Sequence, residues 1–462
     1  MTLIKSISGF RGTIGGNVGD NFTPVDIVIL TSAYAQWLKQ QYPQKKLKVV
    51  VGRDARISGE MAALLVVGAL LGSGIDVVNI GLATTPSTEL AVVYENADGG
   101  IILTASHNPK QWNALKLLNN KGEFLNAAEG KSLLEIAEKS QYSFPNVEET
   151  GKIVKQYSFD ATHIKMVLEN SYVDVDAIRN AKFKIVVDAV NSVGGVVIPE
   201  LLRQLGVEVV EMNCEPTGNF AHNPEPLPEN LTEISQKVVA EKASLGVVVD
   251  PDVDRLVLVC EDGTMFGEEY TLVSVADYVL SKTKGNTVSN LSSSRALKDI
   301  TEKHGAQYFS AAVGEVNVVE KMKNTNAVIG GEGNGGVILP DFHYGRDALI
   351  GIALFLTHLA NTKLKASQLR ATYPNYFMSK NKIQLSQNIN TDNIFNEIKK
   401  KYSVQRITDI DGVKIDFDNE KMWALLRKSN TEPIIRIFAE ANTAAAADKL
   451  AQQIIDDVNN FS

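Results

Sequence analysis

The chain has 462 residues, of which 44% are hydrophobic, and a formal net charge of −8 at neutral pH. This length and composition predict a globular protein of three or four domains. The negative charge argues against a nucleic-acid-binding protein, which needs a basic face to neutralise phosphates. The longest apolar stretch, MAALLVVGALLGSG at residues 61–74, is too short to span a bilayer.

Cysteine usage and the N-terminal residues bear on the compartment. Cys214 and Cys260 are too few for a disulfide framework, which favours a reducing environment. The first residues, MTLIKSISGFRG, lack the charged-then-apolar profile of a signal peptide. We therefore expect a cytoplasmic protein with neither a nucleic-acid nor a membrane partner.

Three segments, at residues 47–81, 183–212 and 286–315, repeat one pattern. A strand rich in β-branched residues leads through a polar loop to an amphipathic helix, a glycine and another strand, which is typical of a right-handed βαβ unit with a parallel sheet. From about residue 370, short strands, an Asp-Gly turn and a closing helix at 444–458 indicate α+β structure. We predict three similar α/β domains with mixed, largely parallel sheets and a smaller C-terminal α+β domain. Their expected bounds are residues 1–155, 156–255, 256–368 and 369–462.

The stretch GGIILTASHNPKQWNALKLL, residues 99–118, places Ser106 in a turn at the end of an apolar strand. Strand-end loops usually display the catalytic groups of α/β proteins. A hydrolytic serine with His107 as its base fits poorly, because neighbouring side chains point to opposite sides and no G-x-S-x-G elbow surrounds Ser106. Two interpretations remain: Ser106 satisfies amides of an exposed turn, or it carries a group that the enzyme passes on.

The stretch LGVVVDPDVDRLVLV places Asp250, Asp252 and Asp254 directly after an apolar strand. Carboxylates so close together repel one another unless a cation neutralises them, and all-oxygen ligation suits magnesium. An EF-hand loop fits poorly, because Arg255 occupies the position that requires glycine. A phosphatase that forms an aspartyl phosphate also uses a D-x-D pattern after a strand, and a solvated acidic turn is the third interpretation.

Two later loops offer groups suited to a sugar phosphate. The sequence GEGNGG at 331–336 has G-x-G-x-x-G spacing, but the residues after it do not open a helix, which argues against dinucleotide binding. It is either a loop that presents Glu332 and Asn334 to sugar hydroxyls or a simple glycine-rich turn. In LLRKSNTEPIIRIF, an arginine, hydroxyls and loop amides suit a phosphate monoester. These residues are Arg427, Ser429, Asn430 and Thr431.

Two N-terminal loops add further cations. Arg11 lies in SGFRG, and Arg53 and Arg56 lie in VGRDARISG. These residues either bind an anion or form surface ion pairs, which is the usual role of such groups.

Together the motifs resemble the α-D-phosphohexomutase family of phosphoglucomutases, phosphomannomutases and phosphoglucosamine mutases. TASHNP is similar to the phosphoserine loop, DPDVDR to the metal loop, GEGNGG to the sugar loop and RKSNTEP to the phosphate loop. The four motifs occur in the family's order and the resemblance covers essentially the whole chain. It implies three α/β domains and a fourth, smaller domain around a central cleft, each contributing one loop.

The resemblance also implies a mechanism. Ser106 would donate a phosphoryl group to a hexose monophosphate and recover one from the 1,6-bisphosphate intermediate, and added hexose 1,6-bisphosphate would act as an activator. Mg²⁺ would be held by Asp250, Asp252, Asp254 and a phosphoryl oxygen on Ser106.

The remaining residues receive roles by the same resemblance. Arg255 and Arg11 would contact the phosphoryl group, while Lys116 and His107 are candidates for proton handling or positioning. Glu332 and Asn334 would bind the sugar. The non-reacting phosphate would be held by Arg427, Ser429, Asn430 and Thr431.

Two features bear on the preferred hexose. Many relatives have serine and histidine in the sugar loop where this chain has Asn334 and Gly336, so Glu332 is the most secure sugar contact. TVSNLSSS is more similar to the phosphoglucosamine mutase branch than to the phosphomannomutase/phosphoglucomutase branch, which tends to have a lysine near Ser292. Glucosamine phosphate is therefore the favoured substrate, and phosphomannomutase/phosphoglucomutase specificity is the alternative. An aspartyl-phosphate phosphatase and a non-catalytic sugar-phosphate-binding protein are the other hypotheses.

Overall fold

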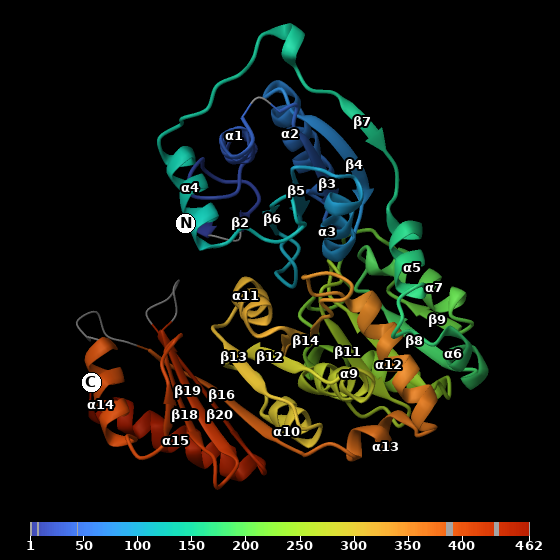
Figure 1. The fold of residues 1–462 in the computed structure, drawn as a ribbon, viewed down its shortest axis with the longest axis vertical. Helices are drawn as coiled ribbons and strands as arrows, with labels where there is room; N and C mark the ends of the chain where they lie inside the picture. Colours follow the sequence, from blue (N-terminus) through green and yellow to red (C-terminus); the bar gives the residue numbers. More distant parts are fainter. Residues whose placement is uncertain (1, 7–8, 44, 385–390, 429–433, 462) are drawn as a thin grey trace. The chain divides into compact units, whose positions relative to one another are not determined.

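The computed structural model describes the chain except residues 1, 7–8, 44, 385–390, 429–433 and 462. The chain divides into two compact units, Met1–Thr271 with Gly335–Leu369, and Leu272–Asn334 with Arg370–Ser462 (Figure 1). Among the described residues, no helix combines the length and the apolar character needed to cross a membrane.

The first unit begins with a seven-stranded mixed sheet in the order β1-β2-β6-β5-β3-β4-β7. The pairs β3–β4, β3–β5 and β4–β7 are parallel, whereas β1–β2, β2–β6 and β5–β6 are antiparallel. The strands are β1 (Ile4–Ser6), β2 (Gly9–Thr13), β3 (Lys48–Arg53), β4 (Asp76–Leu82), β5 (Gly99–Leu103), β6 (Trp112–Leu118) and β7 (Ile153–Gln156).

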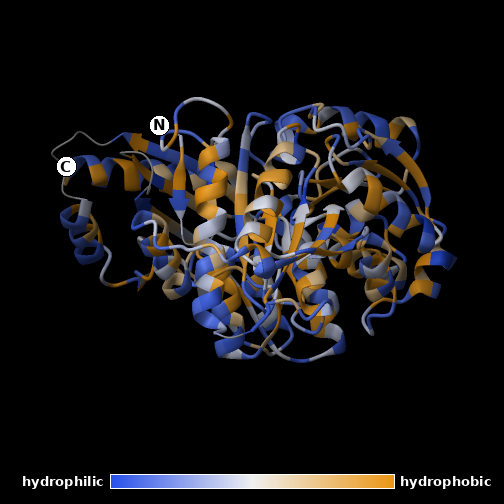
Figure 2. Ribbon diagram, turned by 90° about the horizontal axis from the view of Figure 1, so that it is seen from above, coloured by the Kyte–Doolittle hydropathy of each residue, from blue (hydrophilic) through white to orange (hydrophobic). Residues whose placement is uncertain are grey.

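Helices cover both faces of this sheet, which explains why its central strands are continuously apolar. Val49 and Val51 of β3 belong to one core with residues of α1, α2 and α4, whereas Val50 belongs to another core with residues of α3. Figure 2 shows the hydrophobic residues concentrated on strands and on the covered sides of helices. Thr23 caps α1 with a capping box and Thr84 caps α3. The helices are α1 (Pro24–Gln41), α2 (Gly59–Gly72), α3 (Thr85–Tyr94) and α4 (Ala127–Glu138), followed by the short η1 (Val147–Glu149).

A second sheet of the same unit has the order β11-β10-β8-β9. Strand β8 pairs in parallel with β9 and β10, and β10 pairs antiparallel with β11, so residues 250–255 form the connection between β10 and β11. The strands are β8 (Lys184–Asp188), β9 (Glu208–Met212), β10 (Leu245–Val249) and β11 (Leu256–Cys260). The other elements of this part are α5 (Asp160–Leu168), α6 (Val175–Ala181), α7 (Gly194–Gln204), η2 (Pro228–Asn230), α8 (Thr232–Ala240), β15 (Gly336–Ile338) and α12 (Ala348–Thr362).

The second unit contains a parallel arrangement in which β12 pairs with β13 and β14, and a five-stranded antiparallel sheet in the order β16-β20-β19-β18-β17. One face of the antiparallel sheet forms a core with α14 and α15. The opposite face, with Trp423 and Leu425, packs against Leu291. The parallel strands and their helices are β12 (Asn286–Asn290), α10 (Ala296–Lys303), β13 (Tyr308–Ala311), α11 (Glu315–Thr325) and β14 (Ala327–Glu332).

The C-terminal elements are β16 (Phe377–Gln384), α14 (Thr391–Lys401), β17 (Arg406–Thr408), β18 (Val413–Phe417), β19 (Met422–Lys428), β20 (Ile434–Ala441) and α15 (Ala444–Asn460). The chain passes between the units at three points: within α9 (Glu268–Lys282), in the turn between Asn334 and Gly335, and within α13 (Ala366–Ala371). The predicted class is confirmed, because three α/β segments precede a C-terminal segment with an antiparallel sheet.

Candidate active site

Ser106 lies in the turn that follows β5, as the sequence predicts. Its backbone has φ +48°, a left-handed conformation that residues other than glycine rarely adopt. The Ser106 amide donates to Thr104 Oγ1 at 3.0 Å, and its hydroxyl donates to Asp250 Oδ2 at 2.8 Å. Ser106 is only 8% exposed, so the expectation of an exposed turn is wrong. This acceptor belongs to residues 250–255, which we call the acidic loop because they include Asp250, Asp252 and Asp254.

Arg56 holds the shape of this turn. Its guanidinium is buried and donates through Nε to Asp54 at 3.0 Å, while Asp54 also accepts from Thr104 Oγ1 at 2.7 Å. The interpretation of Arg56 as a surface ion pair is therefore wrong. The turn carbonyls that accept from its Nη atoms are those of Ser106, Asn108, Pro109 and Trp112. One side chain thus satisfies carbonyl groups that regular structure would otherwise have to pair.

Replacement of Arg56 by methionine is expected to lower the free energy of unfolding by about 3–5 kcal/mol, because the buried Asp54 carboxylate loses its charged partner. Urea-induced unfolding of the purified protein measures this loss. Arg203→Met is the matched control, since Arg203 is about half exposed and pairs with Glu211, and its loss should cost less than about 1 kcal/mol. Equal losses in the two variants would contradict the role assigned to Arg56.

Asp250, Asp252 and Asp254 converge in the loop between β10 and β11. All three are fully buried, and one carboxylate oxygen from each lies within 4.8 Å of the others. Asp250 Oδ1 accepts from the amides of Asp254 and Arg255, each at 3.2 Å. Asp252 Oδ1 and Asp254 Oδ1 are buried and accept no hydrogen bond from the residues that the structure describes. A buried carboxylate oxygen without a donor is costly, so the loop has the composition and the unmet acceptors of a cation site.

The pKa shifts of Asp250 and Asp252 also indicate a loop with excess negative charge. Burial, together with the charges of Asp254 and Asp252, raises the pKa of Asp250 well above its ordinary value. Burial also disfavours the charged form of Asp252, but the Lys116 ammonium outweighs it and holds the pKa of Asp252 well below the usual range. Three all-oxygen ligands with excess negative charge fit Mg²⁺.

Two basic side chains neutralise part of this charge. Lys116 Nζ lies 2.6 Å from Asp252 Oδ2 and 3.4 Å from Asp254 Oδ2. Arg346 Nη2 lies 2.6 Å from Asp254 Oδ2. Burial opposes the charge of Lys116, but the two aspartates outweigh it and raise its pKa, so Lys116 is protonated at neutral pH in this arrangement. Lys116 therefore acts here as a cation, not as a base.

Two residues that the sequence did not predict have side chains that contact carboxylates of the acidic loop. Thr85 at the start of α3 donates from Oγ1 to Asp252 Oδ2 at 2.5 Å and from its amide to the Asp252 carbonyl at 2.9 Å. Arg346 is the other. No local sequence pattern predicts the contact of Thr85, which has the appearance of a helix-capping residue. Arg346 could have been predicted as a loop cation from the sequence GRD at 345–347.

His107 contacts Arg255 as well as Ser106. Its Nδ1 accepts from Arg255 Nη2 at 2.8 Å and lies 3.4 Å from Ser106 Oγ. Burial and the Arg255 charge lower the pKa of His107 to about 3. The imidazole is thus neutral at physiological pH, and its Nδ1 lone pair is occupied by Arg255. This geometry favours positioning over proton transfer.

His107→Gln is expected to lower kcat about tenfold, the value of one hydrogen bond to a charged group, with the pH dependence of kcat/KM unchanged. The pH dependence should not change because an imidazole with a pKa of about 3 stays unprotonated throughout the neutral range. Rate profiles of wild type and variant against pH measure this. Disappearance of an ionisation from the variant's profile would show that His107 titrates during turnover.

Arg11 lies on a strand of the first unit, whereas Glu332 and Asn334 of the sugar loop belong to the second unit. Arg11 on β2 is exposed and pairs across the ladder with Ala114 of β6. In the second unit, Glu332 is 5% exposed at the end of β14, and its Oε1 accepts from Asn290 Nδ2 at 2.7 Å and from the Gly314 amide at 3.2 Å. Asn334 follows in the turn, after which strand β15 begins at Gly336. A strand in place of a helix agrees with the argument against dinucleotide binding.

Arg427 lies near the end of β19 in the second unit. Its Nη2 lies 2.9 Å from Asp411 Oδ2, and its Nε is buried and has no hydrogen-bond partner within the described part of the chain. Ser429, Asn430 and Thr431 lie outside the described residues. The first unit therefore brings Ser106, His107, Lys116, Arg255 and the three aspartates together, whereas Glu332, Asn334 and Arg427 belong to the second unit.

The chain is similar to known proteins along most of its length. Four segments match, in order, the phosphoglucomutase/phosphomannomutase α/β/α domains I, II and III and the C-terminal domain, at residues 4–143, 161–263, 267–376 and 386–457. The chain belongs to the phosphoglucomutase/phosphomannomutase family.

Individual phosphoglucomutase/phosphomannomutase relatives match over almost their whole length. A phosphoglucomutase/phosphomannomutase of Thermococcus kodakarensis is 37% identical over 444 residues, covering 94% of this chain and 95% of its own. A phosphoglucosamine/phosphogalactosamine mutase of Sulfurisphaera tokodaii is 32% identical over 453 residues, which cover 96% of this chain and 97% of that protein. A crystal structure of a family protein from Burkholderia thailandensis gives a TM-score of 0.83 at 26% identity, covering 99% of this chain and 96% of that chain. The resemblance seen in the sequence is confirmed, and the protein is an enzyme of the phosphohexomutase class.

Proposed function

We propose that the enzyme interconverts hexose 6-phosphate and hexose 1-phosphate through a phosphoserine at Ser106 and a hexose 1,6-bisphosphate. The observation that carries this proposal is the 2.8 Å hydrogen bond from Ser106 Oγ to a carboxylate of the buried aspartate cluster. A phosphoryl group on that oxygen would meet the acidic loop directly. The Oγ–P bond breaks as a new O–P bond forms to the free sugar hydroxyl, and a phosphoryl group from the other end of the bisphosphate later restores the phosphoserine.

The residues that would hold Mg²⁺ are Asp250, Asp252 and Asp254, together with a phosphoryl oxygen on Ser106. Bound there, the ion would neutralise charge on the transferring group. Arg255 would approach the same group, because its Nε lies 4.0 Å from Asp250 Oδ2 and its Nη2 is held by His107. Lys116, protonated next to Asp252 and Asp254, would balance charge that the phosphoryl group brings into the site.

The non-reacting phosphate is assigned to the loop after β19. The ladder between β19 and β20 places Arg436 directly opposite Arg427, and residues directly opposite lie on the same face of a sheet. Asp411, whose Oδ2 lies 2.9 Å from Arg427 Nη2, already balances part of this positive charge, and a phosphate would add to that balance. The buried Nε of Arg427 is a further donor for such an anion. Ser429, Asn430 and Thr431 follow directly in the sequence and would add neutral donors.

Glu332 and Asn334 are assigned to the sugar, and Arg11 to the phosphoserine. Asn290 and Gly314 fix one oxygen of Glu332, which sets the orientation of its carboxylate. We propose glucosamine phosphate as the preferred substrate and hexose 1,6-bisphosphate as activator, with phosphomannomutase/phosphoglucomutase specificity as the alternative. Relatives named for both specificities are similar to this chain. The proposed domain bounds remain residues 1–155, 156–255, 256–368 and 369–462, each domain contributing one loop.

Arg427→Ala is expected to raise KM for the sugar phosphate about tenfold to a hundredfold, with kcat nearly unchanged, because a charge-assisted hydrogen bond contributes about 1.5–3 kcal/mol. Steady-state kinetics and direct titration with the sugar phosphate measure the two quantities separately. Arg179→Ala is the matched control, since Arg179 is exposed and its ion pair with Asp176 is long, at 3.8 Å. An unchanged KM and Kd in the Arg427 variant would refute the assignment.

A coupled mutase assay primed with hexose 1,6-bisphosphate tests the proposed reaction. Glucosamine, glucose, mannose and N-acetylglucosamine phosphates are compared, and the highest kcat/KM is expected for glucosamine phosphate. Covalent labelling separates a mutase from a phosphatase that uses Asp250, because phosphoserine is stable in acid whereas an acyl phosphate hydrolyses readily in base. Binding without turnover of any of these sugars would instead indicate a sugar-phosphate-binding protein.

A further inference from the structure

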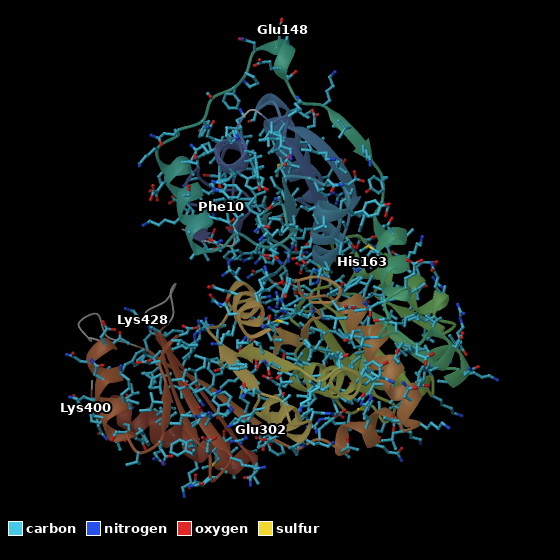
Figure 3. All side chains as sticks on the ribbon, in the orientation of Figure 1. Phe10, Glu148, His163, Glu302, Lys400 and Lys428 are labelled. Carbon is cyan, nitrogen blue, oxygen red and sulfur yellow. The ribbon has the colours of Figure 1, made fainter. Side chains whose placement is uncertain are left out.

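A chain of buried polar side chains joins α3, α5 and the residue that precedes α12. His163, labelled in Figure 3, lies on α5 and is fully buried. Its Nδ1 lies 2.9 Å from Ser87 Oγ and its Nε2 lies 2.9 Å from Asp347 Oδ2. Asp347 caps α12 by accepting from the amides of Leu349 and Ile350. Ser87 and Asp347 are also fully buried. All members of this chain lie in the first unit.

Each end of this chain lies next to a residue that contacts the acidic loop. Ser87 is in the first turn of α3, two residues after Thr85, which holds Asp252 through both its hydroxyl and its amide. At the other end, Arg346 precedes Asp347 and donates to Asp254 Oδ2 at 2.6 Å. The Ala348 amide, directly after Asp347, donates to the Val253 carbonyl at 3.2 Å.

A second histidine fixes the same carboxylate. His343 Nε2 lies 3.1 Å from Asp347 Oδ2, and its Nδ1 lies 3.5 Å from Oε2 of Glu89, two residues after Ser87 on α3. Burial disfavours the charge of Asp347, but the two histidines outweigh it and hold the pKa of Asp347 well below its usual range. Asp347 is therefore an anion that accepts hydrogen bonds from two histidines and two helix amides. These four bonds hold the start of α12 to α5 and to His343.

We propose that His163 is a positioning residue of the acidic loop: by joining Ser87 to Asp347 it fixes Thr85 against Asp252 and Arg346 against Asp254. The inference rests on the proposed metal site. His163 does not contact Asp250, Asp252 or Asp254. It acts through the backbone segments that bear Thr85 and Arg346. Partners behind the direct contacts of a metal site commonly change metal affinity about 10- to 100-fold when removed.

A hydrolytic Ser-His-Asp role for these three residues does not fit their geometry. The Ser87 hydroxyl accepts from Thr84 Oγ1 at 2.8 Å, and none of the three side chains has solvent exposure. No substrate carbonyl could reach Ser87 Oγ within hydrogen-bond distance. The chain of contacts is therefore a structural link between two segments and not a second catalytic centre.

Direct titration with Mn²⁺, followed by the electron paramagnetic resonance signal of the free ion, tests the proposal without depending on turnover. His163→Phe keeps an aromatic ring of similar size and removes both hydrogen bonds, and we expect Mn²⁺ to bind it about tenfold more weakly than wild type. The kcat should fall in parallel while KM for the sugar phosphate stays the same. Ser87→Ala removes only one link and should weaken Mn²⁺ binding by a smaller factor in the same direction.

His304→Phe is the matched control, because His304 forms a comparable contact with Asp277, at 2.7 Å, in the second unit. It should lose stability but keep wild-type Mn²⁺ affinity. A folded His163→Phe protein with Mn²⁺ affinity within about twofold of wild type would overturn the proposal; if that variant does not fold, unchanged affinity in Ser87→Ala overturns it instead. Asp252→Asn separates failure of the proposed metal site from failure of the role proposed for His163. If this variant binds Mn²⁺ as wild type does, the assignment of the metal site itself is wrong.

Discussion

The Ser106→Ala protein is expected to lose at least about four orders of magnitude in mutase turnover, the loss typical of removing a covalent catalyst. The hydroxyl is the only group that the substitution removes, and it is the group proposed to carry the phosphoryl. Hexose 1,6-bisphosphate is supplied in the assay, so that a lack of phosphorylated enzyme cannot explain the loss. Intact-mass measurement of wild type should show a fraction one phosphate heavier, and peptide mapping should place that phosphate within TASHNPK.

Folding should survive this change. The lost hydrogen bond to Asp250 contributes about 1 kcal/mol. Serine and alanine both carry a Cβ atom, so the left-handed backbone at residue 106 costs a similar free energy with either side chain. Ser140→Ala is the matched control, because Ser140 is exposed and has the same φ of +48°. It should retain full activity. A Ser106→Ala enzyme within about tenfold of wild type, a difference of about 1.4 kcal/mol, would refute the phosphoserine and favour Asp250 as the covalent carrier.

Replacement of Asp252 by asparagine is expected to lower kcat about a thousandfold while the Kd of the sugar phosphate changes little. A bound cation contributes several kcal/mol where charge develops on the transferring group, and each 1.4 kcal/mol is about a factor of ten. The same substitution removes the 2.6 Å ion pair with Lys116, so two sources of charge balance are lost together. The sugar phosphate is held mainly by groups that this change leaves intact.

Steady-state kinetics and equilibrium titration with the sugar phosphate distinguish these effects. Asp262→Asn is the control, since Asp262 lies in an exposed turn where its Oδ1 accepts from the amide and the hydroxyl of Thr264. It should match wild type in both measurements. Equal losses of kcat and of sugar-phosphate affinity in the Asp252 variant would show that Asp252 supports binding in general, not the transfer step.

The parts of the site that the sequence could predict are those whose signal is local. Ser106 and Asp250 each follow an apolar strand directly, and a polar cluster after such a strand marks the end of a sheet where catalytic groups lie. The β-branched residues and Pro340 that follow the glycines at 331–336 were sufficient to reject a dinucleotide loop. The three α/β patterns were likewise readable from periodicity alone.

The contacts that the sequence could not predict depend on residues far apart in the chain. Arg56 looks like an ordinary loop cation until the turn after β5 surrounds it with carbonyl groups. Thr85 has the appearance of a helix cap, and its contact with Asp252 spans 167 residues. Burial also reverses the simplest interpretation of His107: a histidine beside a serine suggests a base, yet its low pKa and the bond from Arg255 make it a neutral acceptor.

The contacts of the acidic loop also constrain how the protein reaches its active state. Thr85, Lys116 and Arg346 meet this loop across separations of 92 to 167 residues, so their contacts form only after long loops have closed. In refolding experiments we expect secondary structure to return before cation binding does. During synthesis, the turn with Ser106 is complete long before Arg346 leaves the ribosome. If Ser106 carries the phosphoryl group as proposed, the nascent chain holds this serine through about half of its elongation without the Arg346 charge beside the acidic loop.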